Sequence, residues 1–220
     1  MSAKKILSGL CALAVFAAVQ QAQAVTLDEL IGVGPITAGD LVYSNFHETG
    51  TMPASSITVN FTESGIQFTA DWNNLSGNAD SAIISYDVAP VAGALTGSTL
   101  NMGGSVVVGD AAVSVGETII DLVNYKTYSL QTFDGGPSNP NNSLTDSVDF
   151  DPETTSIHII KSVEVAAGSD GFASLNFVEN LYGEGPTPPP PPPFVIPEPM
   201  SLALLPLSLA ALAVRRRIGR

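Results

Sequence analysis

Four acidic residues lie within eight positions in the segment Asp-Ser-Val-Asp-Phe-Asp-Pro-Glu. They are Asp146, Asp149, Asp151 and Glu153. Closely spaced carboxylate oxygens suit Ca²⁺, so Asp146, Asp149 and Asp151 are candidate calcium ligands. The spacing is not that of an EF-hand, and the glycine that such a loop requires is missing. We therefore expect a solvated acidic loop without metal, and a calcium site is the alternative.

The other residue types that carry chemistry are few. The two histidines, His47 and His158, do not make a zinc site in a chain whose single cysteine is Cys11. His158 stands between Ile157 and Ile159 in an alternating pattern, so we expect it to point away from their side. Neither a Gly-x-Ser-x-Gly elbow nor a glycine-rich phosphate loop occurs. We therefore expect no cofactor and no enzymatic activity; a surface hydrolase with paired carboxylates is an alternative that spacing alone does not decide.

Aromatic side chains offer a second kind of site, because their rings can stack on sugars. Trp72 is the leading candidate, since it ends a predicted strand beside the polar pair Asn73 and Asn74. A lone tryptophan in a sandwich is more often in the core, so we expect Trp72 to be buried, with sugar stacking as the alternative. The other candidates are Tyr43, Tyr86, Tyr125, Tyr128 and Tyr182.

The charge of the chain is concentrated in its central part. Residues 25–184 hold two lysines, Lys126 and Lys161, against twenty acidic residues, a formal charge of −18, whereas the whole chain carries −13. Such a surface repels phosphate backbones, which argues against nucleic acid as a partner. It is typical of a soluble extracellular protein or of one that meets divalent cations.

Period-two alternation dominates the central part and predicts strands. Residues 57–61 and 66–70 alternate on either side of a Glu-Ser-Gly turn and predict a hairpin. Further strands are expected near 41–46, 84–88, 100–108, 112–121, 125–133, 156–165 and 172–181, with a helical turn near 26–31. Eight or nine short strands separated by polar turns predict an all-β fold, an antiparallel, jelly-roll-like β-sandwich over residues 25–184.

The first 24 residues have the order of a secretory signal peptide. Lys4 and Lys5 precede an apolar run over 6–19, and Ala22-Gln23-Ala24 then matches an A-x-A cleavage site. We expect a signal helix that is removed between Ala24 and Val25. The implied partners are the secretion translocon and signal peptidase.

The last part of the chain predicts a stalk and a membrane helix. Residues 185–196 are rich in proline, which disfavours sheet and helix and predicts a stiff linker. An apolar run over 200–214 is long enough for a short transmembrane helix. Three arginines follow, Arg215, Arg216 and Arg217, and should act as a cytoplasmic stop-transfer signal.

A short motif stands between linker and helix: Pro197, Glu198 and Pro199. Each proline disfavours helical geometry at the residue before it, so we expect an extended segment there, of the kind that a protease or transpeptidase binds. Together with the apolar run and the arginines, the motif over 197–220 resembles the PEP-CTERM sorting signal. The resemblance implies an exosortase substrate of Gram-negative bacteria, held transiently in the cytoplasmic membrane and then displayed on the cell surface or released.

The resemblance also implies a role. Organisms with this sorting system commonly make exopolysaccharide, so a structural or adhesive protein of the surface or biofilm matrix is expected, with a carbohydrate-binding module as the alternative. Residues 34–46 resemble a segment found near the mature N-terminus of many such tailed proteins, and residues 161–177 resemble a later one. Neither segment implies an activity.

Overall fold

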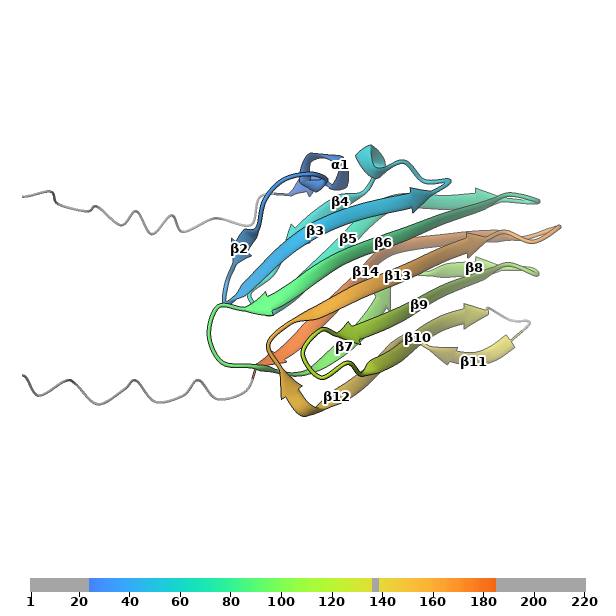
Figure 1. Cartoon of the computed structure of the whole chain (residues 1–220). Helices are drawn as coiled ribbons and strands as arrows, with labels where there is room; N and C mark the ends of the chain where they lie inside the picture. The colour runs from blue at the N-terminus through green and yellow to red at the C-terminus, as the bar shows by residue number, and fades with distance from the viewer. Residues whose placement is uncertain (1–23, 136–138, 185–220) are drawn as a thin grey trace, which may run out of the picture. The chain divides into compact units, whose positions relative to one another are not determined.

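A computed structural model describes residues 24–135 and 139–184, which form two stacked antiparallel sheets (Figure 1). The predictions for the signal segment with Ala22, the proline linker, the Pro197–Pro199 motif and Arg215–Arg217 lie outside these residues. In the described part, no helix has the length and apolarity needed to cross a membrane. The prediction of an all-β antiparallel sandwich is confirmed.

Sheet A has seven strands. Its spatial order is β1 (Val25–Thr26), β4 (Thr58–Phe61), β5 (Gly65–Leu75), β14 (Phe172–Glu184), β7 (Leu95–Gly103) and β12 (Thr145–Thr154), with β8 (Val106–Val108) also paired to β14. β14 therefore lies in the middle of the sheet, hydrogen-bonded to β5 on one side and to β7 and β8 on the other.

Sheet B also has seven strands. Its order is β11 (Asn139–Ser143), β10 (Thr127–Gly135), β9 (Ala112–Asp121), β13 (Ile157–Ala166), β6 (Ala79–Pro90), β3 (Leu41–Gly50) and β2 (Ile36–Ala38). The helix α1 (Leu27–Leu30) and the 3₁₀ helix η1 (Ala54–Ser56) lie between strands of the first third of the chain.

The strongest local predictions are confirmed. The predicted hairpin is β4–β5, with Phe61 opposite Ile66 and Val59 opposite Phe68. The predicted helical turn is α1, which begins after Thr26; the Thr26 backbone N–H donates to Glu29 Oε2 at 3.0 Å. This hydrogen bond satisfies a backbone N–H at the start of the helix that has no partner within the helix.

The predicted number of strands was wrong, because the described residues hold fourteen. The acidic segment expected as a loop is strand β12, and the polar stretch after Asp134 includes β11. The stretch 100–108 is two strands, β7 and β8, broken at Gly104 with φ +68. Two-residue and three-residue strands such as β1 and β2 leave too short a pattern to recognise.

Alternation places one face of each strand in the core. Val113, Val115 and Ile119 of β9 are fully buried, and so are Ile157 and Ile159 of β13. His158 between them is partly exposed, as predicted.

Aromatic rings fill one part of this core. They include Tyr43, Phe46, Phe61, Phe68 and Tyr86, with ring centroids 5.0 Å apart for Tyr43–Phe61 and 5.6 Å for Phe68–Tyr86. Offset aromatic pairs of this kind add to the stability gained from apolar burial.

Candidate functional site

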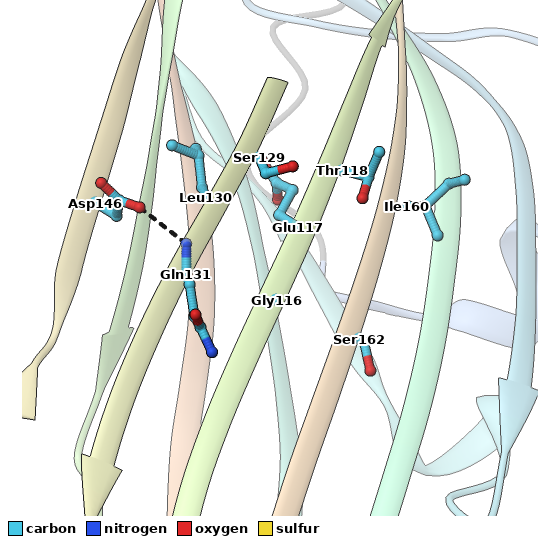
Figure 2. A pocket seen from close by; sticks show the side chains of 9 residues that line it. All are labelled: Gly116, Glu117, Thr118, Ser129, Leu130, Gln131, Asp146, Ile160 and Ser162. Atoms are coloured by element: carbon cyan, nitrogen blue, oxygen red, sulfur yellow. Dashed lines mark hydrogen bonds between the residues drawn. The ribbon is translucent and has the colours of Figure 1, made fainter. Parts of the chain in front are cut away.

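An open groove runs along the outer face of sheet B, over the middle of β9, β10 and β13 (Figure 2). Its volume is about 570 Å³. Outward-facing side chains line it: Thr118 of β9, Ser129 and Gln131 of β10, and Ile160 and Ser162 of β13. Hydroxyl and amide groups therefore surround the aliphatic side chain of Ile160, and Leu130 also lines the groove.

Gly116 forms the floor of the groove. It occupies an outward-facing position of β9, opposite Gln131 on β10 and Ser162 on β13. A Cβ added at Gly116 would meet no heavy atom within 4 Å, and the residue's φ is in the ordinary negative range. The glycine is thus not required by the backbone, and the absence of a side chain there is what opens the groove.

Asp146 closes the groove from the other sheet. It lies on β12, the edge strand of sheet A, and its Oδ2 accepts a hydrogen bond from the Gln131 backbone N–H at 2.9 Å (Figure 2). β11 pairs with β10 only from Phe133 onward, so the N–H of Gln131 is on a free stretch of the β10 edge. The Asp146 carboxylate of sheet A thus accepts a hydrogen bond from a backbone N–H at the edge of sheet B.

The predicted calcium ligands are not brought together. Asp146 is engaged with β10, whereas Asp149 and Asp151 are exposed on β12. Among residues 24–135 and 139–184 there is no group of three or more His, Cys, Asp or Glu side chains placed to hold a metal. Asp146 and Asp149 are three residues apart, so alternation along β12 sends their side chains to opposite faces and separates Asp146 from the other two carboxylates.

Trp72 is buried in the core and not on the surface, so it is not available to stack on a sugar. Its exposed fraction is 0%, and it belongs to the core between the sheets. Tyr43, Tyr86 and Tyr182 are buried as well, whereas Tyr125 is 89% exposed in the turn between β9 and β10. A large apolar surface at an inward position of β5 gains more from the core than from water.

A histidine, a carboxylate and an amide meet on the outer face of sheet B, away from the groove floor. His158 Nδ1 lies 2.5 Å from Asp87 Oδ1, and Asn45 Nδ2 donates to Asp87 Oδ2 at 2.5 Å. His158 and Asp87 face each other across β13 and β6, and Asn45 reaches them from a bulge in β3 with φ +56. His47, two residues after Asn45, is exposed. Asp87 is the partner of His158 and not of His47.

The interior of the sandwich contains a buried polar cluster that sequence reasoning missed. Lys161 of β13 and Glu117 of β9 form an ion pair with both side chains 0% exposed. Asn180 of β14, in the other sheet, donates from Nδ2 to Glu117 Oε1 at 2.8 Å. The carboxylate of Glu117 thus joins the two sheets.

Two tyrosines and a serine complete this cluster. Tyr86 donates its hydroxyl to Asn180 Oδ1 at 3.1 Å and lies 2.9 Å from the Tyr182 hydroxyl. Ser98 Oγ accepts from Asn180 Nδ2 at 3.4 Å.

Burial shifts the titration of the cluster. It raises the pKa of Tyr86 and of Tyr182 well above the usual range, because the phenolate would be desolvated and would face Glu117. Burial also lowers the pKa of Lys161, and this effect outweighs the raising influence of Glu117. Low dielectric therefore favours the uncharged form of each of these three side chains.

The alternation of the strands could have revealed the cluster. Lys161 continues the inward series Ile157, Ile159, and Glu117 continues the inward series Val113, Val115. A charged residue at an inward position of such a series indicates either that the strand is wrongly assigned or that the charge has a buried partner. Lys161 and Glu117 are 44 residues apart, so the sequence alone did not pair them.

Comparisons with known proteins are distant. No family model matches the chain, and no curated protein is similar to it. Among solved structures, TmCBM61 in complex with β-1,4-galactotriose is similar over 64% of this chain and 90% of its own, with 15% identity and a TM-score of 0.37. The xylan-binding module CBM15 covers 67% of this chain and 100% of its own, with 12% identity and a TM-score of 0.29.

A bacteriophage CBA120 tailspike protein 4 domain is similar at the same level. It covers 65% of this chain but only 19% of its own, at 12% identity and a TM-score of 0.28. With TM-scores below 0.5, these similarities carry no argument about function.

Proposed function

We propose that this protein is exported and displayed at the cell surface, where the outer face of sheet B holds a neutral polysaccharide of the surrounding matrix. The observation that carries the binding role is the groove around Gly116. Its lining of hydroxyl and amide groups offers both donors and acceptors, which is what a chain of sugar hydroxyls needs.

The shape of the groove fits an extended ligand better than a small one. It is open to solvent rather than enclosed, so a sugar chain can lie across it without being surrounded. A groove of this kind buries one face of a sugar chain and leaves the rest in water, which gives weak affinity per site. Adhesion then depends on many displayed copies that act on one long polymer.

Charge favours a neutral ligand. The formal charge of −18 over residues 25–184 would repel a polyanionic polysaccharide. Of the residues that line the groove, Thr118, Ser129, Gln131 and Ser162 are uncharged, and the Asp146 carboxylate is occupied by the Gln131 backbone. Glu117 turns its carboxylate away from the groove, into the interior.

The proposal assigns no hydrolase activity to the groove. Hydrolysis of a sugar chain needs two carboxyl groups on either side of the bond that is cut. Asp146 is the one groove-lining carboxylate that is not buried, and it stands without a second carboxyl partner among those residues.

Export and sorting are supported by the order of segments in the sequence. The sandwich begins with β1 at Val25, the residue that follows the expected cleavage site. We propose that signal peptidase cuts there, that the apolar run over 200–214 holds the protein in the cytoplasmic membrane, and that an exosortase-like transpeptidase cuts near Pro197–Pro199. Mass spectrometry of the surface protein tests this step: a mature form that retains residues 200–220 would contradict it.

Filling the floor of the groove tests the binding role. Gly116→Leu places a side chain in open space, so the fold is retained while the ligand is displaced. We expect binding to the extracted neutral polysaccharide of the producing organism to weaken about tenfold or more. Gly34→Leu is the matched control, because a Cβ at Gly34 also meets nothing within 4 Å and lies outside the groove. Equal binding by the two variants, or no binding by the unmodified protein, would rule out the groove.

A further inference from the structure

A lysine amine and an asparagine carboxamide are bound to the same buried carboxylate. Lys161 Nζ donates to Oε2 of Glu117, and Asn180 Nδ2 donates to Oε1 of the same side chain at 2.8 Å. Lys161 and Asn180 are 0% exposed, and Glu117 is 3% exposed. A nucleophile and a carboxamide thus share one carboxylate, in a site shielded from water, and that carboxylate can accept and return protons.

The hydrogen bonds fix the orientation of the carboxamide. A carboxylate only accepts, so the nitrogen of Asn180 must face Glu117 and the oxygen must face Tyr86. The Tyr86 hydroxyl donates to Asn180 Oδ1 at 3.1 Å, and its own oxygen lies 2.9 Å from the Tyr182 hydroxyl. The oxygen that gains negative charge when a nucleophile adds to the carboxamide therefore already has a donor.

We propose that Lys161 and Asn180 condense to an intramolecular amide bond that links sheet B to sheet A. The nucleophile is the Lys161 amine, the acyl group is the Asn180 carboxamide, Glu117 transfers the protons, and Tyr86 stabilises the oxyanion. Each of these four groups contacts a reacting atom, directly or through the proton that it moves.

The steps balance without any other reactant. Glu117 takes a proton from the Lys161 ammonium, which leaves a neutral amine. The amine nitrogen bonds to Cγ of Asn180, and the electron pair of the C=O bond moves onto Oδ1. Glu117 passes its proton to Nδ2 and accepts one from the former amine. The C=O bond re-forms as the Cγ–Nδ2 bond breaks, which releases ammonia. The ammonia then takes the proton that Glu117 holds and leaves as ammonium. The products are one secondary amide and one ammonium ion, with Glu117 again a carboxylate.

The electrostatics of the site favour this direction. Burial lowers the pKa of Lys161, which makes the neutral nucleophile more accessible than for a lysine in water. The reaction also removes a buried ammonium group, and buried charges are costly even when they are paired.

The placement of the two residues gives the bond a structural effect. Lys161 and Asn180 lie on consecutive strands, β13 and β14, that belong to different sheets. The chain has a single cysteine, Cys11, so it cannot form an internal disulfide between the sheets. The proposed amide would supply the cross-link that cysteine chemistry does not.

Peptide mapping of the full-length protein, purified in its folded form and then denatured, tests the proposal. A glutamyl endopeptidase cuts after Glu153, Glu164, Glu179 and Glu184 and so separates residues 154–164 from residues 180–184. We expect these two peptides to stay joined, at their summed mass less one ammonia, about 17 Da. Trypsin should also fail to cut after Lys161 while it cuts after Lys126. Two separate peptides of unchanged mass would overturn the proposal.

Three variants identify the groups. Asn180→Asp should give the same joined peptides with a loss of water, about 18 Da, because the leaving group is then hydroxide rather than ammonia. Glu117→Gln should give separate peptides, and Lys126→Arg, on the surface, should behave as the unmodified protein. In the unmodified protein, residues 154–164 joined with loss of water to the fragment that contains Glu117 would show that Glu117, not Asn180, is the acyl group and would overturn the assignment. The unmodified protein and Asn180→Asp decide the question even if Glu117→Gln does not fold.

Discussion

Asp110 and Ser169 tie two turns together at one end of the sandwich. Asp110 precedes β9, and Ser169 lies in the turn between β13 and β14. The Asp110 carboxylate accepts from the Ser169 hydroxyl at 2.7 Å, from the Ser169 backbone N–H at 2.9 Å and from the Asp170 backbone N–H at 3.1 Å. These bonds lower the pKa of Asp110 to about 2, from an ordinary value of 3.8.

This pKa predicts an acid-sensitive contribution to stability. The folded-state pKa is depressed, so the contribution is complete above pH 3.8 and is lost as the pH falls toward about 2. Denaturation midpoints of the unmodified protein and of Asp110→Ala should therefore differ at neutral pH and converge at low pH. Asp149→Ala, which removes an exposed carboxylate of β12, should show no such convergence. A constant difference across the whole pH range would contradict the prediction.

Alanine substitutions at Gly168 and Gly77 can separate the cost of backbone strain from the cost of a steric clash. Both have positive φ, +67 and +80, and an alanine there costs about 1–2 kcal/mol from backbone strain alone. A Cβ at Gly168 would also lie 2.4 Å from Asp110 Oδ1 and 2.7 Å from the Asp110 carbonyl oxygen, whereas one at Gly77 meets nothing within 4 Å. We expect Gly168→Ala to reduce the free energy of unfolding more than Gly77→Ala, measured by denaturant titration. Equal losses would mean that Asp110 and its turn move aside without cost.

Trp72→Ala should unfold the protein more readily without a specific effect on a ligand. Trp72 is fully buried, so its truncation leaves a cavity and costs about 3–5 kcal/mol in the free energy of unfolding. Urea titration followed by circular dichroism measures this loss. Under conditions where the variant is folded, polysaccharide binding should equal that of the unmodified protein. A stable variant that has lost binding would contradict the prediction and implicate Trp72 in ligand binding.

The buried pair Lys161 and Glu117 should tolerate joint replacement better than single replacement. Lys161→Met or Glu117→Leu alone leaves an unpaired charge at a site without water and should cost about 3–5 kcal/mol. The double variant removes both charges and keeps apolar volume, so it should be more stable than either single variant. All three variants lack the proposed amide, which makes the comparison independent of that bond. A double variant that is no more stable than the two single variants would contradict strong coupling.

The sequence predicted most of the regular sheet and little of the site. Strands with clean alternation, such as the β4–β5 hairpin, were recognisable because a half-buried strand requires that pattern. Strand β12 was missed because its exposed face carries Asp149, Asp151 and Glu153, and its pairing with β7 reflects tertiary contacts that composition does not record.

The candidate site was hidden for two physical reasons. The groove depends on the absence of a side chain at Gly116 and on the register that places Gln131 and Ser162 on either side of it. The register between strands distant in the sequence cannot be predicted from local sequence patterns. Asn180, in the interior, meets Glu117 only because sheet A folds over sheet B. Trp72 followed the more general expectation, since a single tryptophan in a small sandwich contributes more to the core than to a surface.

The central position of β14 determines how the molecule responds to force. A pull on the chain beyond Glu184 loads β14 first, and β14 is hydrogen-bonded to β5 along one side and to β7 and β8 along the other. Such a pull runs along the strand, so many transverse hydrogen bonds must shear at the same time rather than peel one by one from an edge. A pull from the C-terminal end would therefore act on a strand that is paired on both sides rather than on an edge strand.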